Sequence, residues 1–344
     1  MRTPRASAAR SLGPALCRFQ FGDPVTLHID PSNPPTGDPE HDYFVGYHAG
    51  LFYDVLGQSN RLRDIRCEAS SPAEPKALVS AFSETAGTVR FYRGLLRKMY
   101  KNLQTIQTDI SALPGEAQEE FRAMRKIDVR VHSFSDSTFA HLPLLEAPGP
   151  GHPIISVHAL IFAGAVMLLQ SLANGHPIRA ALTVGCATNL EADEIYGPLL
   201  DTIYLLESKV AGHPRVVVGD GLLDYLRYAA AIPGDSRPIQ IQRRFAGLAQ
   251  RLLTKDEDDV WIVDYLGPGM HALIGPSMNP KLVLLALETS REAVASNAAA
   301  GNEKLRVRYE AVVRYLERNA PRWLDETWHN IALHLTAAGR GLQC

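Results

Sequence analysis

An apolar run, IISVHALIFAGAVMLLQSLA at residues 154–173, restricts the fold of this chain more than any other segment. A run of this length and composition fits either a membrane-spanning helix or a helix buried in a soluble core. Ser156, His158, Gln170 and Ser171 interrupt it, and no cluster of Lys or Arg flanks either end. We therefore predict a buried helix in a soluble protein that has no contact with a membrane.

The composition of the 344-residue chain excludes several classes of protein. Apolar residues make up 46%, charged residues make up 21%, and the formal net charge is −2. Broad disorder needs lower hydrophobicity or higher net charge, and binding nucleic acid mainly through its phosphates needs a basic excess. We therefore expect a folded protein with no nucleic-acid partner. The scattered cysteines indicate neither a disulfide framework nor a zinc site and favour a reducing, cytoplasmic setting: Cys17, Cys67, Cys186 and Cys344.

Residues 1–40 have the composition of a flexible N-terminal segment. The first 22 residues hold four arginines and no acid, and they lack the continuous apolar core of a secretory signal. A loose basic tail and a transit peptide both fit this pattern. The Pro-rich stretch PSNPPTGDPE at 31–40 indicates a linker into the folded domain.

Beyond this linker the chain alternates between strand-like and helix-like patterns. Strands are predicted at 46–57, 177–188, 214–219 and 260–267, with a hairpin at 127–144. Helices are predicted at 74–108, 198–211 and 220–231, and from Pro280 to about Ala338 with breaks near Gly301 and Pro321. We therefore predict one α/β domain of the α+β type at 41–270, with a central mixed sheet flanked by helices, and a C-terminal helical region at 271–344.

Common catalytic signatures are missing from the sequence. It contains no G-x-S-x-G, H-E-x-x-H or G-x-x-x-x-G-K-[ST] motif. The segment GPGMHA at 267–272 resembles half of a dinucleotide-binding loop, but the continuing helix and the following acid are missing.

Two carboxylates are the candidate catalytic groups. Asp54 ends an apolar strand in FYDVLG, and Asp136 lies at the centre of HSFSDSTF, at the expected tip of the hairpin. Two such acids brought together repel each other unless a divalent cation neutralises them, and carboxylate oxygens suit Mg²⁺ or Mn²⁺. The alternative is that Asp54 caps the turn at Gly57 and that Asp136 is simply a turn residue.

The order of the motifs resembles the class III nucleotidyl cyclase catalytic domain over about residues 44–267. The motifs are FYDVLGQS, VHSFSDST, the long apolar helix, GHPIRAALTVG and IYGPLLDTIYLLESKVAGHPRVVV. Within that superfamily the chain is most similar to the bacterial anti-phage pyrimidine cyclases, the Pycsar enzymes. These share a similar first strand, and an extended helical segment between the acids, here 82 positions apart, also fits them.

The resemblance implies a two-metal site shared between two chains. Asp54 and Asp136 would hold two divalent cations, Mn or Mg, and the Val55 carbonyl would add a ligand. Phe52 lies on the same strand face as Asp54, where it would contact the nucleotide or pack in the core. Because such sites form between two catalytic domains and the chain has one, a homodimer with shared active sites is implied.

The sequence departs from adenylate and guanylate cyclases in the helix after Gly197. That helix carries an Asn and then an Arg in those enzymes, whereas this chain has Asp201 and Leu205 at the same spacings. Either another cation substitutes, with Arg179 and Lys209 as candidates, or the domain is catalytically inactive. Arg179 also fits a charge at a strand edge and Lys209 a solvated helix residue. We expect Arg215 to form a structural ion pair.

The function expected from the resemblance is a pyrimidine nucleotide cyclase. It would convert UTP to cyclic UMP and pyrophosphate, and the product would signal phage infection to a separate effector that binds the cyclic nucleotide. The alternatives are a cytidylate cyclase acting on CTP, a purine cyclase, and a regulatory module that binds nucleotide without turnover. The apolar faces of the C-terminal helices, which include Val312, Tyr315 and Leu316, would serve the dimer or pack on the domain.

Overall fold

A single mixed sheet runs through the part of the chain that the computed structural model describes, which is residues 25–28, 42–58, 75–105, 129–144, 153–191 and 194–324. Its strands are β1 (Val25–His28), β2 (Asp42–Val55), β3 (Arg130–Phe134), β4 (Ser137–Pro143), β5 (Ile178–Glu191), β6 (Glu194–Tyr196), β7 (Val216–Val218), β8 (Leu253–Lys255) and β9 (Trp261–Val263). The order is β3-β4-β2-β5-β7-β9-β8, with β1 paired to β2 and β6 paired to β5. The predicted α+β class with a central mixed sheet is confirmed.

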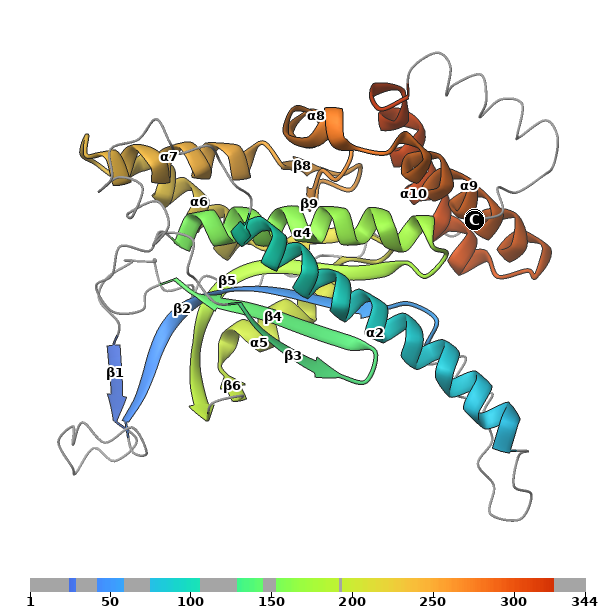
Figure 1. The fold of residues 1–344 in the computed structure, drawn as a ribbon, viewed down its shortest axis with the longest axis horizontal. Helices are drawn as coiled ribbons and strands as arrows, with labels where there is room; N and C mark the ends of the chain where they lie inside the picture. Colours follow the sequence, from blue (N-terminus) through green and yellow to red (C-terminus); the bar gives the residue numbers. More distant parts are fainter. Residues whose placement is uncertain are drawn as a thin grey trace, which may run out of the picture.

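The first half of the sheet has a β-α-β-β-α-β connection. β2 is followed by α2 (Pro75–Thr105), the β3–β4 hairpin, α4 (Pro153–Ala173) and β5. β2 lies between β4 and β5 and is antiparallel to both. α2 and α4 lie on one face of the sheet (Figure 1). This topology brings the C-terminal end of β2 and the tip of the β3–β4 hairpin to the same end of the sheet.

Helix α4 is the core helix that the apolar run predicted. It is long and apolar enough to cross a membrane, but 78% of its most apolar window is buried inside the fold. The sheet lies on one side of it, and α2, α7 (Arg237–Gln250) and α9 (Pro280–Ala299) contact its other sides (Figure 1). Since these elements cover nearly its whole circumference, α4 has the environment of a core helix in a soluble protein.

Helix α5 (Pro198–Leu205) lies on the opposite face of the sheet (Figure 1). Leu199 and Ile203 pack with Phe139 and Ala181 in a second, smaller apolar cluster. The helix begins at Gly197, which has φ of +140°, and Pro198 follows at the first helical position. A Cβ on Gly197 would lie 2.9 Å from the Cys186 carbonyl oxygen, so only glycine allows this close approach to β5.

The C-terminal helices pack onto the core of the sheet domain. α9 is followed by α10 (Glu303–Asn319), and Val312, Tyr315 and Leu316 of α10 are buried in the same cluster as α4. The Tyr315 hydroxyl donates to Asp264 at 2.6 Å and accepts from the Leu266 amide at 3.0 Å. Of the two predicted alternatives for this apolar face, packing on the domain is the one observed.

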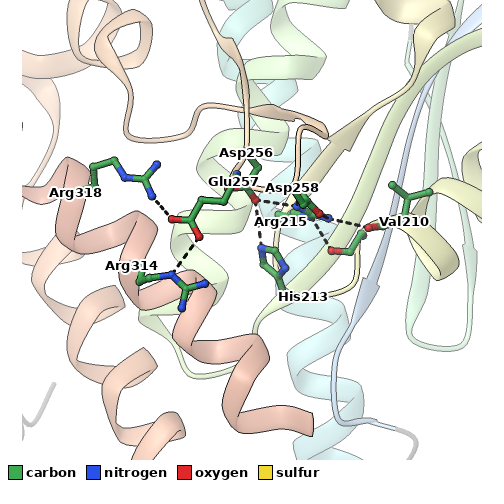
Figure 2. Close-up of polar contacts among 9 residues, drawn as sticks. Val210, His213, Arg215, Asp256, Glu257, Asp258, Arg314 and Arg318 are labelled. Atoms are coloured by element: carbon green, nitrogen blue, oxygen red, sulfur yellow. Dashed lines mark hydrogen bonds and ion pairs between the residues drawn. The ribbon is translucent and has the colours of Figure 1, made fainter. Parts of the chain in front are cut away.

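A buried arginine connects the start of β7 to the β8–β9 connection (Figure 2). The Arg215 guanidinium donates to Asp256 at 2.8 Å and to Asp258 at 2.7 and 2.8 Å, and its side chain is only 4% exposed. The neighbouring Glu257 pairs with Arg314 and Arg318 of α10. The structural role predicted for Arg215 is confirmed.

Several predicted elements differ from the structure. The strand predicted at 260–267 covers only Trp261–Val263, because the residues after it turn into α8 (Pro268–Ile274). The helix predicted at 198–211 is α-helical only to Leu205 and continues as a π-helical turn, η1 (Leu206–Val210).

Other elements were missed or lie outside the described residues. The sequence did not predict β1, β6, α7, β8 or α8, whereas α6 (Asp220–Ala231) follows the prediction. The GPGMHA segment therefore starts a short helix rather than half of a dinucleotide-binding loop. The predicted flexible segment 1–40, except β1, and the helix predicted beyond Leu324 lie outside the described residues.

Candidate active site

The two predicted acids lie at the same end of the sheet, where β2 ends and the β3–β4 hairpin turns. Asp54 is the penultimate residue of β2, where it pairs in register with Ser137 of β4 and Arg179 of β5. Asp136 is the second residue of the two-residue turn that joins β3 to β4, directly before Ser137. Ser135, the first turn residue, has φ of 51°, the left-handed conformation that tight hairpins require. The antiparallel pairing of β2 and β4 therefore brings together two acids that are 82 positions apart.

Asp54 is half-buried, and its surroundings act on its charge in opposite directions. Burial raises the pKa of its carboxyl, and the negative charge of Asp136 raises it further. The Ser137 hydroxyl donates to Asp54 Oδ1 at 2.9 Å and lowers the pKa, as does the charge of Arg179. Together these effects raise the pKa of Asp54, which indicates that the carboxylate has too little positive charge around it.

Arg179 lies beside Asp54 but is paired with another acid. Its Nε donates to Glu207, which is 2% exposed and belongs to the π-helical turn η1. Burial raises the pKa of Glu207, the hydrogen bond and charge of Arg179 lower it, and the charge of Asp54 raises it. The site therefore contains a third acid, Glu207, which was not among the predicted site residues. The signal for it was the position of Glu207 at the end of the Gly-Pro helix.

The remaining candidates occupy different surroundings. Phe52 is half-buried on the Asp54 face and packs on the second apolar cluster, with its ring edge against Tyr204 at 6.1 Å between centroids. This contact matches the core-packing alternative for Phe52. The Val55 side chain is buried in the main core on the other face of β2. Lys209 is exposed on η1.

The helix that would carry a transition-state arginine presents apolar side chains instead. Leu205 of α5 is 48% exposed and the adjacent Tyr204 is 57% exposed. Tyr196, on the neighbouring strand β6, is 66% exposed. Asp201, one turn before Leu205, is also exposed. The apolar surface of α5 thus reaches Phe52, which contacts Tyr204, whereas β6 pairs with the end of β5 that is far from Asp54.

The acids present the chemistry that a divalent cation requires. No group of three or more His, Cys, Asp or Glu side chains in the described ranges has an arrangement ready to hold a metal. However, Asp54 and Asp136 are close enough for the charge of one to raise the pKa of the other. A cation between them would relieve both this repulsion and the cost of burying Asp54. The residues present therefore fit a site completed by substrate oxygens rather than one formed by protein alone.

No protein-family model matches the chain, and no curated protein sequence matches it.

Proposed function

We propose that this protein is a nucleotidyl cyclase that acts on pyrimidine nucleoside triphosphates. The observation that carries the proposal is the position of Asp54 and Asp136 at one edge of the β-α-β-β-α-β sheet, one at the end of β2 and one in the adjacent hairpin turn. This arrangement agrees with the motif order that resembles class III cyclases. UTP is the preferred substrate on that resemblance, and CTP is the nearest alternative.

The reaction is an intramolecular displacement at phosphorus. The 3′-hydroxyl oxygen attacks the α-phosphorus, a new O3′–Pα bond forms, and the bond from Pα to the oxygen that bridges to the β-phosphate breaks. Pyrophosphate leaves with the bonding electron pair, and the hydroxyl proton passes to solvent. The products are a cyclic nucleotide and pyrophosphate.

The proposed roles of the residues follow from their positions. Asp54 and Asp136, with the Val55 carbonyl, would hold two divalent cations, Mn or Mg. When bound, such cations lower the pKa of the 3′-hydroxyl and offset negative charge on the phosphates. Ser137 orients the Asp54 carboxylate through its hydrogen bond. Arg179, held in place by Glu207, supplies positive charge beside the acids and is the substrate-binding cation of this proposal.

A second copy of the chain completes the proposed site. The exposed apolar side chains of Tyr204 and Leu205 lie on α5, and Tyr204 contacts Phe52 on the face of the sheet to which Asp54 belongs. A two-fold homodimer would cover these side chains and bring residues of one chain to the acids of the other. The proposal also includes a cytoplasmic location and a separate effector that binds the cyclic nucleotide during anti-phage defence.

A regulatory module that binds nucleotide without turnover is the second candidate. Leu205 favours it, because an arginine is expected at that position in an active purine cyclase. The acid pair favours the cyclase, because both acids proposed to hold the catalytic cations are present. A purine cyclase differs from the main proposal only in its substrate.

One experiment separates these candidates. The pure full-length protein is incubated with each of the four nucleoside triphosphates and Mn²⁺, and the products are identified by mass spectrometry. Cyclic UMP or cyclic CMP supports the proposal, whereas a cyclic purine nucleotide identifies the purine cyclase. Absence of a cyclic product with every triphosphate overturns the enzymatic proposal and favours the regulatory module.

A further inference from the structure

A cavity of about 590 Å³ lies between helix α2 and the tip of the β3–β4 hairpin. Ser133, Ser135 and Asp136 line it from the hairpin, and Gln58 lines it from the chain that follows β2. The cavity therefore begins at one of the two proposed metal-binding acids and extends along α2. Its volume lies within the range of small-molecule sites, which is roughly 300–1,000 Å³.

Three arginines of α2 form the basic wall of this cavity. Arg90, Arg93 and Arg97 all line it and follow one another at helical spacing, so they share one face of α2. Asp136 is the only acidic residue among the described residues that line the cavity. The wall therefore carries an excess of positive charge.

Two side chains in the cavity have buried polar atoms without partners among the described residues. Gln58 is 1% exposed, and neither its amide nitrogen nor its amide oxygen has a hydrogen-bond partner among the described residues. Arg93 donates from Nη2 to the Ser135 carbonyl at 2.6 Å, but its buried Nε has no partner there. Buried polar groups without partners are uncommon in folded proteins and call for an explanation. A bound polar ligand would supply the missing partners.

The spacing of the arginines indicates the shape of the ligand. Arg90 and Arg97 are separated by about 10 Å along the helix axis, which suits an extended anion better than a single phosphate. Guanidinium groups match phosphate oxygens through paired hydrogen bonds. Gly94 also lines the cavity, and a Cβ at this position would meet no atom within 4 Å, so the space in front of α2 is open.

We propose that this cavity, the arginine pocket, binds an oligophosphate group. The proposal builds on the cyclase function because Asp136 borders both sites, yet the arginines act on the anion and not on the acid pair. The source of the oligophosphate is either the tail of the bound nucleoside triphosphate or a free polyphosphate.

The test measures binding of inorganic tripolyphosphate to the full-length protein by calorimetry, in buffer that contains a chelator and no divalent cation. We expect saturable binding of one anion per chain. The double variant Arg90→Ala/Arg97→Ala should weaken it at least tenfold, and because both side chains are exposed the fold should be retained, as a thermal melt will verify. Lys98→Ala is the matched control, since Lys98 is exposed on the same helix and does not line the cavity.

The same measurement contains the results that would overturn the proposal. The arginine pocket is wrong if tripolyphosphate does not bind, or if Lys98→Ala weakens binding as much as the double variant does. In the second case binding reflects only general attraction to a basic helix.

Competition with nucleotide distinguishes the two sources. If UTP displaces tripolyphosphate and the double variant raises the KM for UTP, the pocket holds the substrate's tail. If UTP does not displace it, the pocket holds a separate polyphosphate. Tripolyphosphate binding without any cyclic product supports the pocket and refutes the cyclase. If cyclic product forms, the KM of the double variant is unchanged and tripolyphosphate does not bind, the cyclase is supported and the arginine pocket is refuted.

Discussion

Ser137 of β4 donates its hydroxyl to the Asp54 carboxylate of β2 at 2.9 Å, across the strand pair that brings the two proposed catalytic acids together. Ser137 directly follows Asp136, so one short segment both supplies the second acid and orients the first. The geometry of the acid pair therefore depends on the register of β2 against β4, and a slip by one residue would separate the acids.

The acid pair is the first target for mutation. Asp54→Asn and Asp136→Asn should each lower formation of cyclic nucleotide by about 100-fold or more, because each removes a carboxylate proposed to hold divalent cations. Asp235→Asn is the control, since Asp235 is an exposed acid before α7 and outside the proposed site. Product formation by mass spectrometry and Mn²⁺ binding by electron paramagnetic resonance measure the effect. Full activity in both variants would refute the two-metal assignment.

The Ser137 hydrogen bond predicts a change in pH dependence. Because the hydroxyl lowers the pKa of Asp54, Ser137→Ala should raise that pKa. The acidic limb of the pH–activity profile should then move to higher pH, and Mn²⁺ affinity should fall by about tenfold. Ser137→Thr keeps a hydroxyl at this strand position and should restore the wild-type profile. An unchanged profile in Ser137→Ala would show that Ser137 does not act on Asp54.

Arg215 should be the most important ion-pairing residue for stability. Arg215→Met leaves two carboxylates, Asp256 and Asp258, without their partner, and should lower the free energy of unfolding by about 3–5 kcal/mol at neutral pH. Arg227→Met is the control, since Arg227 pairs with Asp224 at the surface, and should cost less than about 1 kcal/mol. Chemical denaturation measures both values.

The loss caused by Arg215→Met should also depend on pH. Burial raises the pKa of Asp256, but hydrogen bonds from His213, the Glu257 amide and Arg215 outweigh burial, so the net pKa lies below the ordinary value. A lowered carboxyl pKa stabilises the fold at pH values above the ordinary pKa, and this contribution is lost as the pH falls below it. The difference between wild type and Arg215→Met should therefore shrink in acid. A difference that stays constant down to about pH 3 would contradict this explanation.

Buried histidines on the sheet should make the fold sensitive to mild acid. Burial, with the charge of Arg130, lowers the pKa of His48 to about 4. Burial and nearby charges lower the pKa of His141 to about 3, and their Nδ1 atoms lie 3.2 Å apart. Both stay neutral in the fold and gain a proton on unfolding below the ordinary histidine pKa, so stability should fall as the pH decreases from about 6.5.

A histidine variant tests this prediction. His141→Gln should reduce the slope of the unfolding free energy against pH, between about pH 4.5 and 6, by up to about 1.4 kcal/mol per pH unit. His271→Gln, which changes an exposed histidine, is the control. Denaturant titrations at several pH values supply the slopes, and equal slopes in wild type and His141→Gln would refute the prediction.

The exposed α5 surface predicts the oligomeric state. Leu205→Glu introduces a charge into the proposed dimer interface, so the variant should sediment as a monomer and lose at least about tenfold of its cyclase activity. Val307→Glu is the control, because Val307 is equally exposed at 48% but lies on α10. Analytical ultracentrifugation measures the state. A monomeric wild type, or a fully active dimer of Leu205→Glu, would contradict the prediction.

Local pattern was sufficient for most elements of the first half of the chain. The polar interruptions of the apolar run at 154–173 predicted a buried helix, and the Ser-Asp centre of the 127–144 segment predicted its turn. Helix α7 was missed because its sequence, RPIQIQRRFAGLAQ, begins with the alternation IQIQ, which has the period of a strand. Its buried face includes the small residues Ala246 and Ala249.

The sequence by itself singled out the candidate catalytic residues and the segments that have to be buried. Side-chain type and spacing are local properties, and they singled out Asp54 and Asp136 without knowledge of their neighbours. The tertiary structure alone decided that β2 and β4 hold these acids at one edge, that Arg179 pairs with Glu207, and that the α2 arginines face the hairpin tip. Such contacts join segments far apart in the chain, and strand pairing and helix packing set them rather than any local period of the sequence.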